Sequence, residues 1–222
     1  MTVHRIDPRR GYDLWSDAYD TTPNPVVRID ERITPGLVES RPGELVLDAG
    51  CGTGRSVTAL RAGGGRVVGL DFSVGMLRVA RRKHPDLPVA VADLQRPWPV
   101  RDGAVDAILC ALVGEHLERL DVVIGEMWRT LAPGGRVVFS VYHPAMAEAG
   151  AEANFHRGEV EYRLGAVRHA VRDYTGAFVR AGFADPAVQE FAGDEALAAD
   201  LPRARKYVGF PMLLVYQTSK PR

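Results

Sequence analysis

The sequence predicts an α/β protein with a mostly parallel sheet that is covered by helices on both faces. Short, nearly continuous apolar runs alternate with stretches of helical periodicity along most of the chain, and this alternation is typical of a parallel sheet with helical crossovers. The last two apolar runs are separated by no long helical stretch, only by a short one at 195–201. Those two strands are therefore expected to be antiparallel neighbours.

Each predicted strand is a short apolar run bounded by turn or polar residues. The strands are residues 44–50, 66–71, 89–93, 104–112, 136–142, 187–192 and 210–219. Each predicted helix carries apolar residues at helical spacing or a helix-capping residue. The helices are residues 12–19, 55–62, the segment that follows Ser73, 117–131, 172–183 and 195–201. Gly63, Pro133 and Gly182 are the expected stops.

Two segments do not follow this alternation of strand and helix patterns. Residues 21–30 contain two prolines and are expected to lack regular structure, and residues 145–168 are polar and small with no clean period. Before the first of them, Tyr12, Trp15 and Tyr19 share one face of the helix 12–19. The N-terminal helix is therefore expected to present an aromatic face and to be joined to the sheet by an irregular linker.

The composition of the 222 residues is that of a soluble globular protein, with 46% hydrophobic and 25% charged residues. Lys+Arg and Asp+Glu are both 28, and this zero net charge argues against a dedicated nucleic-acid binder. No apolar run approaches the length of a membrane span, and the N-terminus lacks a signal-like apolar stretch. A cytoplasmic protein is expected. Cys51 and Cys110 are too few for a metal cluster and are expected to be free thiols.

A glycine-rich turn follows the first predicted strand and precedes a helix. Gly50, Gly52 and Gly54 form a GxGxG pattern, which differs from the GxGxxG of dinucleotide-binding proteins. Glycines at such a turn let the backbone approach a ligand closely, and this is the edge where open α/β sheets bind their ligands. A tight strand–helix turn without a ligand is the alternative.

Three carboxylates lie at or near the ends of the first three strands and are expected to face one rim. They are Asp48, Asp71 and Asp93. A carboxylate at the position of Asp71 can accept hydrogen bonds from the vicinal hydroxyls of a ribose, and one at Asp93 can accept from an adenine amine. The alternative for each is a structural helix-terminal charge.

Five segments, in this order, carry a resemblance to a known family: VLDAGCGTG, GLDFSVGML, VADLQRPWPV, DAILCAL and LAPGGRVVFSVYHP. From about residue 12 to the C-terminus the chain resembles class I S-adenosylmethionine-dependent methyltransferases of the small-molecule type. The resemblance implies a Rossmann-like, seven-stranded, mostly parallel sheet with helices on both faces and an antiparallel last strand. It implies a single methyltransferase domain over residues 1–222, with an N-terminal cap segment at 1–40 and a substrate-side insert at 145–168.

The resemblance also implies which residues hold S-adenosyl-L-methionine and its product S-adenosyl-L-homocysteine. They are Asp48, Gly50, Cys51 and Gly52 for the methionine part, Asp71 for the ribose, Phe72, Met76, Asp93 and Leu94 around the adenine, Cys110 and Ala111 on the sulfonium side, and Tyr19 from the cap. Plain core packing is the alternative for Phe72, Met76 and Cys110.

Three histidines are candidates for a catalytic base. His143 follows the fifth strand, His116 follows the fourth, and His169 precedes the helix 172–183. An unperturbed histidine titrates near neutrality and can take a proton. A base is needed only when the acceptor loses a proton, and the alternative for each histidine is a loop position without a role.

The expected function is methyl transfer to the O, N or C atom of a small-molecule acceptor, a type of reaction found in natural-product biosynthesis and secondary metabolism. No metal, nucleic acid or membrane partner is expected, and a monomer and a homodimer are both open. The segment CALVGEHL contains no proline, unlike the Asn/Asp-Pro-Pro-aromatic motif of enzymes that methylate DNA bases. Two alternatives are a protein of the same fold that binds the cofactor but catalyses a non-methylating cyclisation or related step, and a regulatory binder without chemistry.

Overall fold

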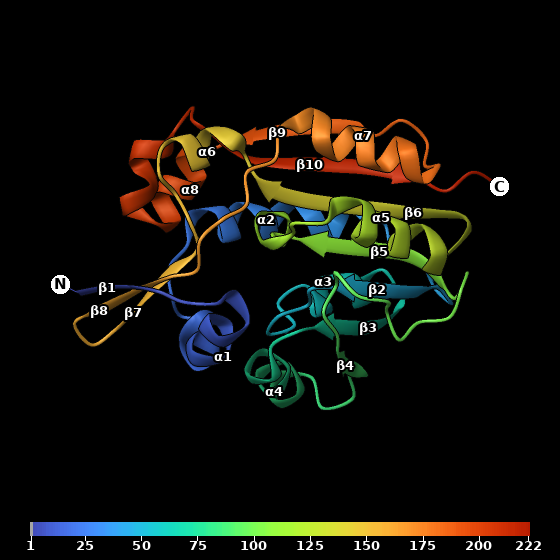
Figure 1. Ribbon diagram of the computed structural model, residues 1–222, viewed down its shortest axis with the longest axis horizontal. Coiled ribbons are helices and arrows are strands. Elements are labelled where there is room, and N and C mark those ends of the chain that lie inside the picture. The colour runs from blue at the N-terminus through green and yellow to red at the C-terminus, as the bar shows by residue number, and fades with distance from the viewer. Residues whose placement is uncertain (1) are drawn as a thin grey trace.

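A seven-stranded sheet with strand order β4-β3-β2-β5-β6-β10-β9 forms the centre of the molecule (Figure 1). We describe residues 2–222 from a computed structural model. The strands are β2 Leu45–Ala49, β3 Arg66–Asp71, β4 Val89–Val91, β5 Val105–Ala111, β6 Leu131–Tyr142, β9 Ala187–Ala192 and β10 Pro211–Ser219. Strands β2 to β6 pair in parallel, whereas β10 pairs antiparallel with both β6 and β9. The predicted Rossmann-like α/β fold with an antiparallel last strand is confirmed.

Helices cover both faces of this sheet. One face carries α2 Pro25–Leu37, α3 Val57–Ala62, α4 Val74–Lys83 and α8 Glu195–Asp200, and the other carries α5 Leu120–Thr130 and α7 Val171–Ala181. Neighbouring strand residues point to opposite faces, so Val46 packs in the first layer and Leu47 in the second. Because helices cover both faces of the sheet, both sets of strand side chains are buried, and the strands are nearly continuous apolar runs in the sequence.

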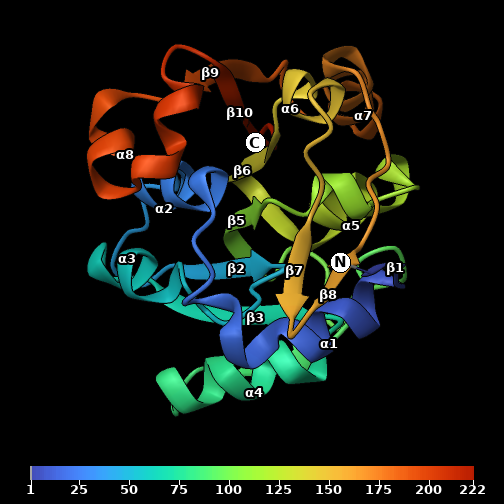
Figure 2. The same cartoon turned by 90° about the vertical axis from the view of Figure 1, so that its left-hand side faces the viewer.

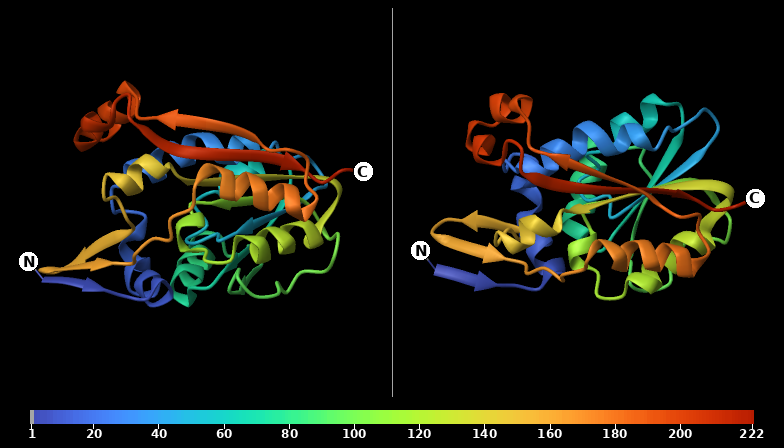
Figure 3. Two further views of the ribbon diagram at one scale, coloured as in Figure 1. Left: turned by 45° about the horizontal axis from the view of Figure 1, so that its top comes forward. Right: turned by 90° about the horizontal axis from the view of Figure 1, so that it is seen from above.

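A second, three-stranded sheet lies beyond the carboxyl ends of the parallel strands (Figures 2 and 3). It consists of β1 Thr2–Arg5, β8 Val160–Arg163 and β7 Asn154–Arg157, and it packs with α1 Pro8–Tyr19. We call these four elements the cap. Trp15 of α1 stacks on Phe155 with ring centroids 5.1 Å apart, and Phe155 stacks on Tyr162 at 5.0 Å. The predicted cap segment and the predicted insert therefore meet in one unit, while their roles toward a substrate stay predictions.

Residues 145–168, whose sequence shows no clean period, contain regular structure. The segment contains the short helix α6 Pro144–Glu148 and the hairpin β7–β8. Its strands have four residues each, too few for a clear alternation. Strand β8 pairs in parallel with β1 at the other end of the chain. Local periodicity does not reveal a pairing between such distant segments.

The prediction of an irregular linker at 21–30 was wrong, because α2 begins inside it. The side chain of Asn24 accepts hydrogen bonds from the backbone N–H groups of Val26 and Val27, and Pro25 occupies the first turn. A proline at this position costs nothing, since its missing N–H would have no helical partner there. The two prolines mark a helix start rather than a break.

The cap helix α1 is attached to α4 by its carboxylates. Asp13 Oδ1 accepts from Ser73 Oγ at 2.6 Å and from the backbone N–H of Gly75 at 2.8 Å. Arg82 and Lys83, on the basic end of α4, pair with Asp17 of α1 and with Asp20, the C-cap residue of α1, at 2.8 and 2.7 Å. Exposed ion pairs of this kind contribute little each, so the Asp13 contact is the main polar anchor of the cap.

Within residues 2–222, no helix is both long enough and apolar enough to pass through a membrane. Across the same residues, no group of three or more His, Cys, Asp and Glu side chains is arranged to hold a metal ion. Cys51 and Cys110 are both buried and free.

Gly63→Ala is expected to destabilise the fold by roughly 1–3 kcal/mol, the usual cost of overpacking. A Cβ at Gly63, the residue after α3, would lie 2.1 Å from the backbone carbonyl oxygen of Ser40, so the backbone must move. Gly125 in the middle of α5 is the matched control, because a Cβ there meets nothing within 4 Å. Gly125→Ala should gain about 0.5–1 kcal/mol from helix propensity. Urea unfolding followed by circular dichroism measures both, and equal stabilities of the two variants would contradict the packing argument.

Candidate functional site

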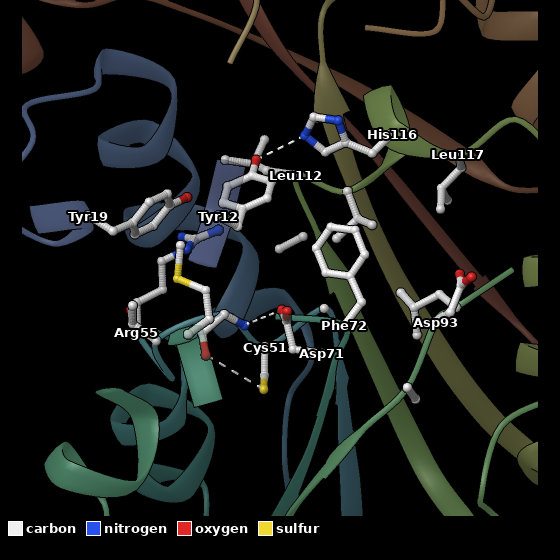
Figure 4. Close-up of a pocket in the computed structure, with 18 of the residues that line it drawn as sticks. Tyr12, Tyr19, Cys51, Arg55, Asp71, Phe72, Asp93, Leu112, His116 and Leu117 are labelled. Carbon is white, nitrogen blue, oxygen red and sulfur yellow. Dashed lines mark hydrogen bonds between the residues drawn. The ribbon is translucent and has the colours of Figure 1, made fainter. Parts of the chain in front are cut away.

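A cavity lies at the carboxyl edge of the sheet, between the strand ends and the cap helix α1 (Figure 4). It encloses about 740 Å³ of empty space, its open mouth included, a size typical of small-molecule and cofactor sites. Most of the predicted cofactor residues line it: Tyr19, Gly50, Cys51, Gly52, Asp71, Phe72, Met76, Asp93, Leu94 and Ala111. The structure thus brings these residues together, and their individual roles stay predictions.

The glycine turn forms the floor of the cavity. Gly50, Gly52 and Gly54 have φ values of 85°, 52° and 73°, a region that favours glycine. The backbone N–H groups of Gly50 and Cys51 both donate to the carbonyl oxygen of Leu70, at 2.7 and 2.9 Å. A Cβ on Gly52 would meet nothing within 4 Å, so the backbone there is open to a ligand. The strand-end position and the positive φ values explain why the sequence places glycines here.

Asp71 is held in place by two backbone donors. Its Oδ2 accepts from the N–H of Gly52 at 2.9 Å and its Oδ1 from the N–H of Ser73 at 2.8 Å. Only 7% of the residue is exposed, and burial raises the pKa of its carboxyl to about 6 despite these bonds. Each carboxylate oxygen can accept more than one hydrogen bond, so Asp71 can still receive two vicinal hydroxyls.

The outer end of the cavity is apolar with one exposed carboxylate. Phe72, Met76 and Leu94 lie on its wall, and Met76 and Leu94 are almost fully buried. The Asp93 side chain is 47% exposed, and its Oδ1 accepts from the backbone N–H of Gln95 at 2.9 Å. A flat ring with an exocyclic amine fits this combination of apolar walls and a carboxylate at the rim.

Two predicted cofactor residues do not reach the cavity wall. Cys110 is fully buried in the core beneath α5 and α7, where burial raises the pKa of its thiol, and Asp48 is 2% exposed with Oδ2 lacking a hydrogen-bond partner. Both lie one residue before the end of their strands, at positions that face inward rather than along the rim. Burial raises the pKa of Asp48 to about 7, while the charge of Arg55 opposes that rise.

His116 is the predicted catalytic residue that does line the cavity. It belongs to the short helix η1 Gly114–His116 after β5, and its Nε2 lies 2.9 Å from the hydroxyl of Tyr12 in the cap. Burial lowers the pKa of His116 to about 4, so the imidazole is neutral at pH 7. Figure 4 shows this hydrogen bond at the upper edge of the cavity, above Phe72.

The other two predicted histidines, His143 and His169, do not line the cavity, and their catalytic role stays a prediction. His143 Nδ1 accepts from the backbone N–H of Ala145 at 3.1 Å, and the residue serves as the N-cap of α6. His169 Nε2 lies 2.6 Å from the carbonyl oxygen of Leu117, and His169 lines a separate groove along α5 and α7. The loops that carry them leave the sheet at the same edge but turn away from the cavity.

Several wall residues were missed by sequence reasoning. They are Tyr12, Thr53, Arg55, Ala92, Gln95, Leu112, Val113 and Leu117. Leu112 has φ 55°, an uncommon value for a non-glycine residue, and it turns the chain toward the cavity straight after β5. The available signal was sequence proximity, since all of these except Tyr12 and Leu117 lie within three residues of a predicted strand end or the glycine turn.

Glu115 is a buried carboxyl next to this wall. The residue is 7% exposed, and its Oε2 has no hydrogen-bond partner. Burial, with a smaller contribution from Asp30, raises its pKa to about 8. At neutral pH the Glu115 carboxyl is therefore largely protonated and uncharged.

Comparisons with known proteins show a likeness to methyltransferases. Residues 47–139 match a family described as "Methyltransferase domain". A demethylmenaquinone methyltransferase of Streptomyces avermitilis is 34% identical over 142 residues, which are 64% of this chain and 60% of that protein. A malonyl-[acyl-carrier protein] O-methyltransferase of Serratia marcescens is 33% identical over 139 residues, 63% of this chain and 54% of that protein. The chain thus matches little more than half the length of these relatives.

Solved structures support the fold. An S-adenosylmethionine-dependent methyltransferase from Mesorhizobium loti has a TM-score of 0.70 at 23% identity, covering 88% of this chain and 98% of the other. The [4+2]-cyclase SpnF has a TM-score of 0.72 at 18% identity, covering 100% and 99%. A geranyl diphosphate C-methyltransferase from Streptomyces coelicolor, solved with S-adenosyl-L-homocysteine, has a TM-score of 0.64 at 17% identity, covering 87% and 79%.

The sheet order and the cavity at its carboxyl edge define a Rossmann-like protein that binds a nucleoside-containing cofactor. Residues 47–139 match the methyltransferase domain family, and the chain is similar to S-adenosylmethionine-dependent methyltransferases. Its cofactor is S-adenosyl-L-methionine. The residues present fit this group, because the open backbone at Gly52, the Asp71 carboxylate and a buried, unpartnered guanidinium nitrogen of Arg55 suit its different parts.

Asp48→Asn is expected to stabilise the ligand-free protein more at pH 8 than at pH 5. The pKa of Asp48 is about 7 in the folded state, against about 3.9 in an unfolded chain. Between these values the folded state holds a proton that the unfolded state has released, so the free energy of unfolding falls as the pH rises. Asparagine removes that loss, by roughly 1–3 kcal/mol at pH 8.

Thermal unfolding at both pH values measures the effect. Asp121→Asn is the control, because the Asp121 side chain is 71% exposed and its removal should act equally at both pH values. A stabilisation by Asp48→Asn that does not depend on pH would contradict the burial argument.

Proposed function

We propose that this protein transfers the methyl group of S-adenosyl-L-methionine to an O, N or C atom of a small-molecule acceptor. The observation that carries the proposal is the cavity itself, in which the Asp71 carboxylate is fixed between the Gly52 and Ser73 backbone beside an open glycine turn. The relatives named for demethylmenaquinone and for malonyl-[acyl-carrier protein] support methyl transfer as the reaction class. When bound, the cofactor supplies an electrophilic methyl group on a sulfonium.

Different cavity residues are proposed to bind the ribose, the adenine and the methionine end of the cofactor. The Asp71 carboxylate accepts hydrogen bonds from the two ribose hydroxyls. Phe72, Met76 and Leu94 contact the adenine, and Asp93 accepts from its amine. The backbone of Gly50 to Gly52 supports the methionine end. This assignment follows the order of the residues along the cavity, from the exposed Asp93 rim to the buried turn.

Tyr12 and His116 are proposed to orient the acceptor. The neutral His116 imidazole is 2.9 Å from the Tyr12 hydroxyl, and an acceptor hydroxyl or amine can replace Tyr12 as its hydrogen-bond partner. With a pKa of about 4, His116 is a weak base at neutral pH. Acceleration therefore comes mainly from positioning the acceptor atom in line with the methyl group, under a cap that excludes water.

A non-methylating cyclisation is the second candidate, supported by the structural likeness to the cyclase SpnF. The same cavity residues would hold the cofactor in both cases. Incubation with S-adenosyl-L-methionine labelled in its methyl group, over a panel of phenols, amines and carboxylic acids, separates the two. Transfer of label supports the methyltransferase, whereas acceptor turnover without transfer supports the cyclase.

Both S-adenosyl-L-methionine and S-adenosyl-L-homocysteine are expected to bind in isothermal titration calorimetry, and Asp71→Asn should weaken both about 10- to 100-fold. The amide nitrogen of asparagine cannot accept hydrogen bonds from the ribose, and bonds to a charged acceptor are worth the most. Asp86→Asn is the control, because the Asp86 side chain is 75% exposed on the surface. No binding of either compound to the wild type would contradict the proposed function, and unchanged affinity in Asp71→Asn would remove Asp71 from the site.

His116→Ala is expected to lower turnover at least about tenfold on any acceptor that the labelled-methyl screen identifies, because the acceptor loses its hydrogen-bond partner in the cavity. His143→Ala is the matched control. That histidine caps α6 and lies 3.6 Å from Glu190, away from the cavity wall, so its variant should keep turnover within about twofold per folded molecule. The opposite ranking, with His143→Ala the slower enzyme, would contradict the placement of the acceptor beside His116.

A further inference from the structure

The fold leaves the Glu115 carboxyl buried and only partly satisfied. Glu115 belongs to η1, and 7% of the residue is exposed. Its Oε2 has no hydrogen-bond partner among residues 2–222. Val113 and His116, two residues before it and one after it in the chain, both line the cofactor cavity. Because a buried polar atom without a partner is costly, this oxygen is suited to a group that a ligand brings.

Tyrosine hydroxyls from three different elements surround the Glu115 carboxyl. Burial is the main cause of the raised pKa of four tyrosines, and the charge of Glu115 adds to that rise in each of them: Tyr12 and Tyr19 of α1, Tyr142 of β6 and Tyr174 of α7. These hydroxyls therefore keep their protons at neutral pH. The other titratable groups close enough to act on Glu115, or to be acted on by it, are Asp30 of α2, Arg55 and Cys110 of β5.

Aromatic rings form the cavity wall beside this carboxyl. The Tyr12 ring lies 6.1 Å from the ring of Tyr19, 6.1 Å from that of Phe72 and 5.4 Å from that of His116, between ring centroids. Figure 4 shows Tyr12 between Tyr19 and Phe72, with its hydroxyl bonded to His116. The faces of such rings attract a cation.

An ammonium group meets both needs of the Glu115 carboxyl. Its N–H bonds can donate to the free oxygen, and its charge favours the ionised carboxylate. A hydroxyl donates but brings no charge, a carboxylate adds a second negative charge, and the sulfonium of the cofactor has no N–H or O–H to donate. Arg55, the nearby cation, is already paired with Asp30. The missing partner is therefore a cationic donor from outside the chain.

We propose that the methyl acceptor is a protonated amine and that Glu115 binds its ammonium group and takes its proton. This inference rests on the proposed function, because it assigns the acceptor atom of that same site. The amine reaches Glu115 by replacing the Tyr12 hydroxyl at His116, the residue that follows Glu115 in η1.

Proton and electron pairs balance in two steps. An N–H bond of the ammonium breaks, its proton bonds to a Glu115 oxygen, and the nitrogen keeps the electron pair. The nitrogen lone pair then forms the N–CH3 bond as the S–CH3 bond breaks, and the electrons of the broken bond stay on the sulfur of S-adenosyl-L-homocysteine. Glu115 releases its proton to solvent when the methylated ammonium leaves. Burial raises the pKa of Glu115 to about 8, which brings it closer to the pKa of an alkylammonium, about 10.4, and makes the carboxylate a stronger base.

A screen of matched acceptors tests the acceptor class. Alkyl and arylalkyl primary amines, such as 2-phenylethylamine, are each paired with the alcohol of the same skeleton, such as 2-phenylethanol, and incubated with methyl-labelled S-adenosyl-L-methionine. Label is expected on the nitrogen of at least one amine and on none of the alcohols. Label on alcohols, phenols or carboxylic acids alone would overturn this inference and leave the proposed methyl transfer intact. Transfer to no compound of any class would contradict the proposed function as well.

Glu115→Gln, assayed with the amine that accepts label, tests the residue. At pH 7 turnover should fall at least about tenfold. The affinity of the S-adenosyl-L-homocysteine complex for the amine, measured by calorimetry, should fall about tenfold or more, while the affinity for S-adenosyl-L-homocysteine stays within about twofold. Glu118→Gln is the matched control, because Glu118 carries the same charge on the exposed surface three residues further along the chain. It should change none of the three quantities.

The pH profile separates a proton acceptor from a support of the fold. In the wild type, kcat/KM should rise with pH and level off at or below about pH 8, where Glu115 is ionised. In Glu115→Gln the rise should continue toward the pKa of the free amine, about 10, because only the neutral amine can react. A loss of equal size at every pH, or an affinity for S-adenosyl-L-homocysteine that falls as far as turnover, would overturn the role of Glu115.

Discussion

The Asp71 carboxylate is the contact on which the geometry of the site depends. It accepts one backbone N–H from the glycine turn, at Gly52, and one from the start of α4, at Ser73. Ser73 continues the chain of hydrogen bonds through its hydroxyl to Asp13 in the cap helix α1. The turn, the second crossover helix and the cap are thus positioned relative to one another by one buried side chain. A ligand bound to Asp71 would contact the point where these three parts meet.

Three buried carboxyl groups in and beside the cavity are costly to ionise. Burial raises the pKa of Asp71 to about 6, of Asp48 to about 7 and of Glu115 to about 8. The nearby buried cation, Arg55, is already paired with Asp30. A positively charged ligand favours the ionised form of such carboxyls, so the stability of the empty protein and its affinity for a sulfonium depend on the same groups. The buried carboxyls therefore lower the stability of the folded protein and favour the binding of a cationic ligand, a combination that is common at functional sites.

A position near the carboxyl edge of the sheet does not by itself decide which of the three candidate histidines lines the cavity. His116 and His143 follow strands that end at the carboxyl edge, and His169 precedes α7; these positions in the sequence made all three candidates. His143 instead caps α6, and His169 is bonded to the Leu117 carbonyl. His116 reaches the cavity from η1, the short helix that follows β5. Which loop folds inward depends on contacts with the cap and with α7, and these contacts join segments far apart in the chain.

The sequence by itself determined the sheet, its alternating helices, the glycine turn and the carboxylate at Asp71, because each depends on local period, turn chemistry or adjacency to a strand end. Only the tertiary structure decided that β1 pairs with β8 to complete the cap, that Asp48 and Cys110 point inward, and that Arg55 is anchored by Asp30 with one arm free. These features arise from pairing and burial between distant segments. Their short strands and single side chains carry no periodic signal, and the packing of the whole chain sets their direction.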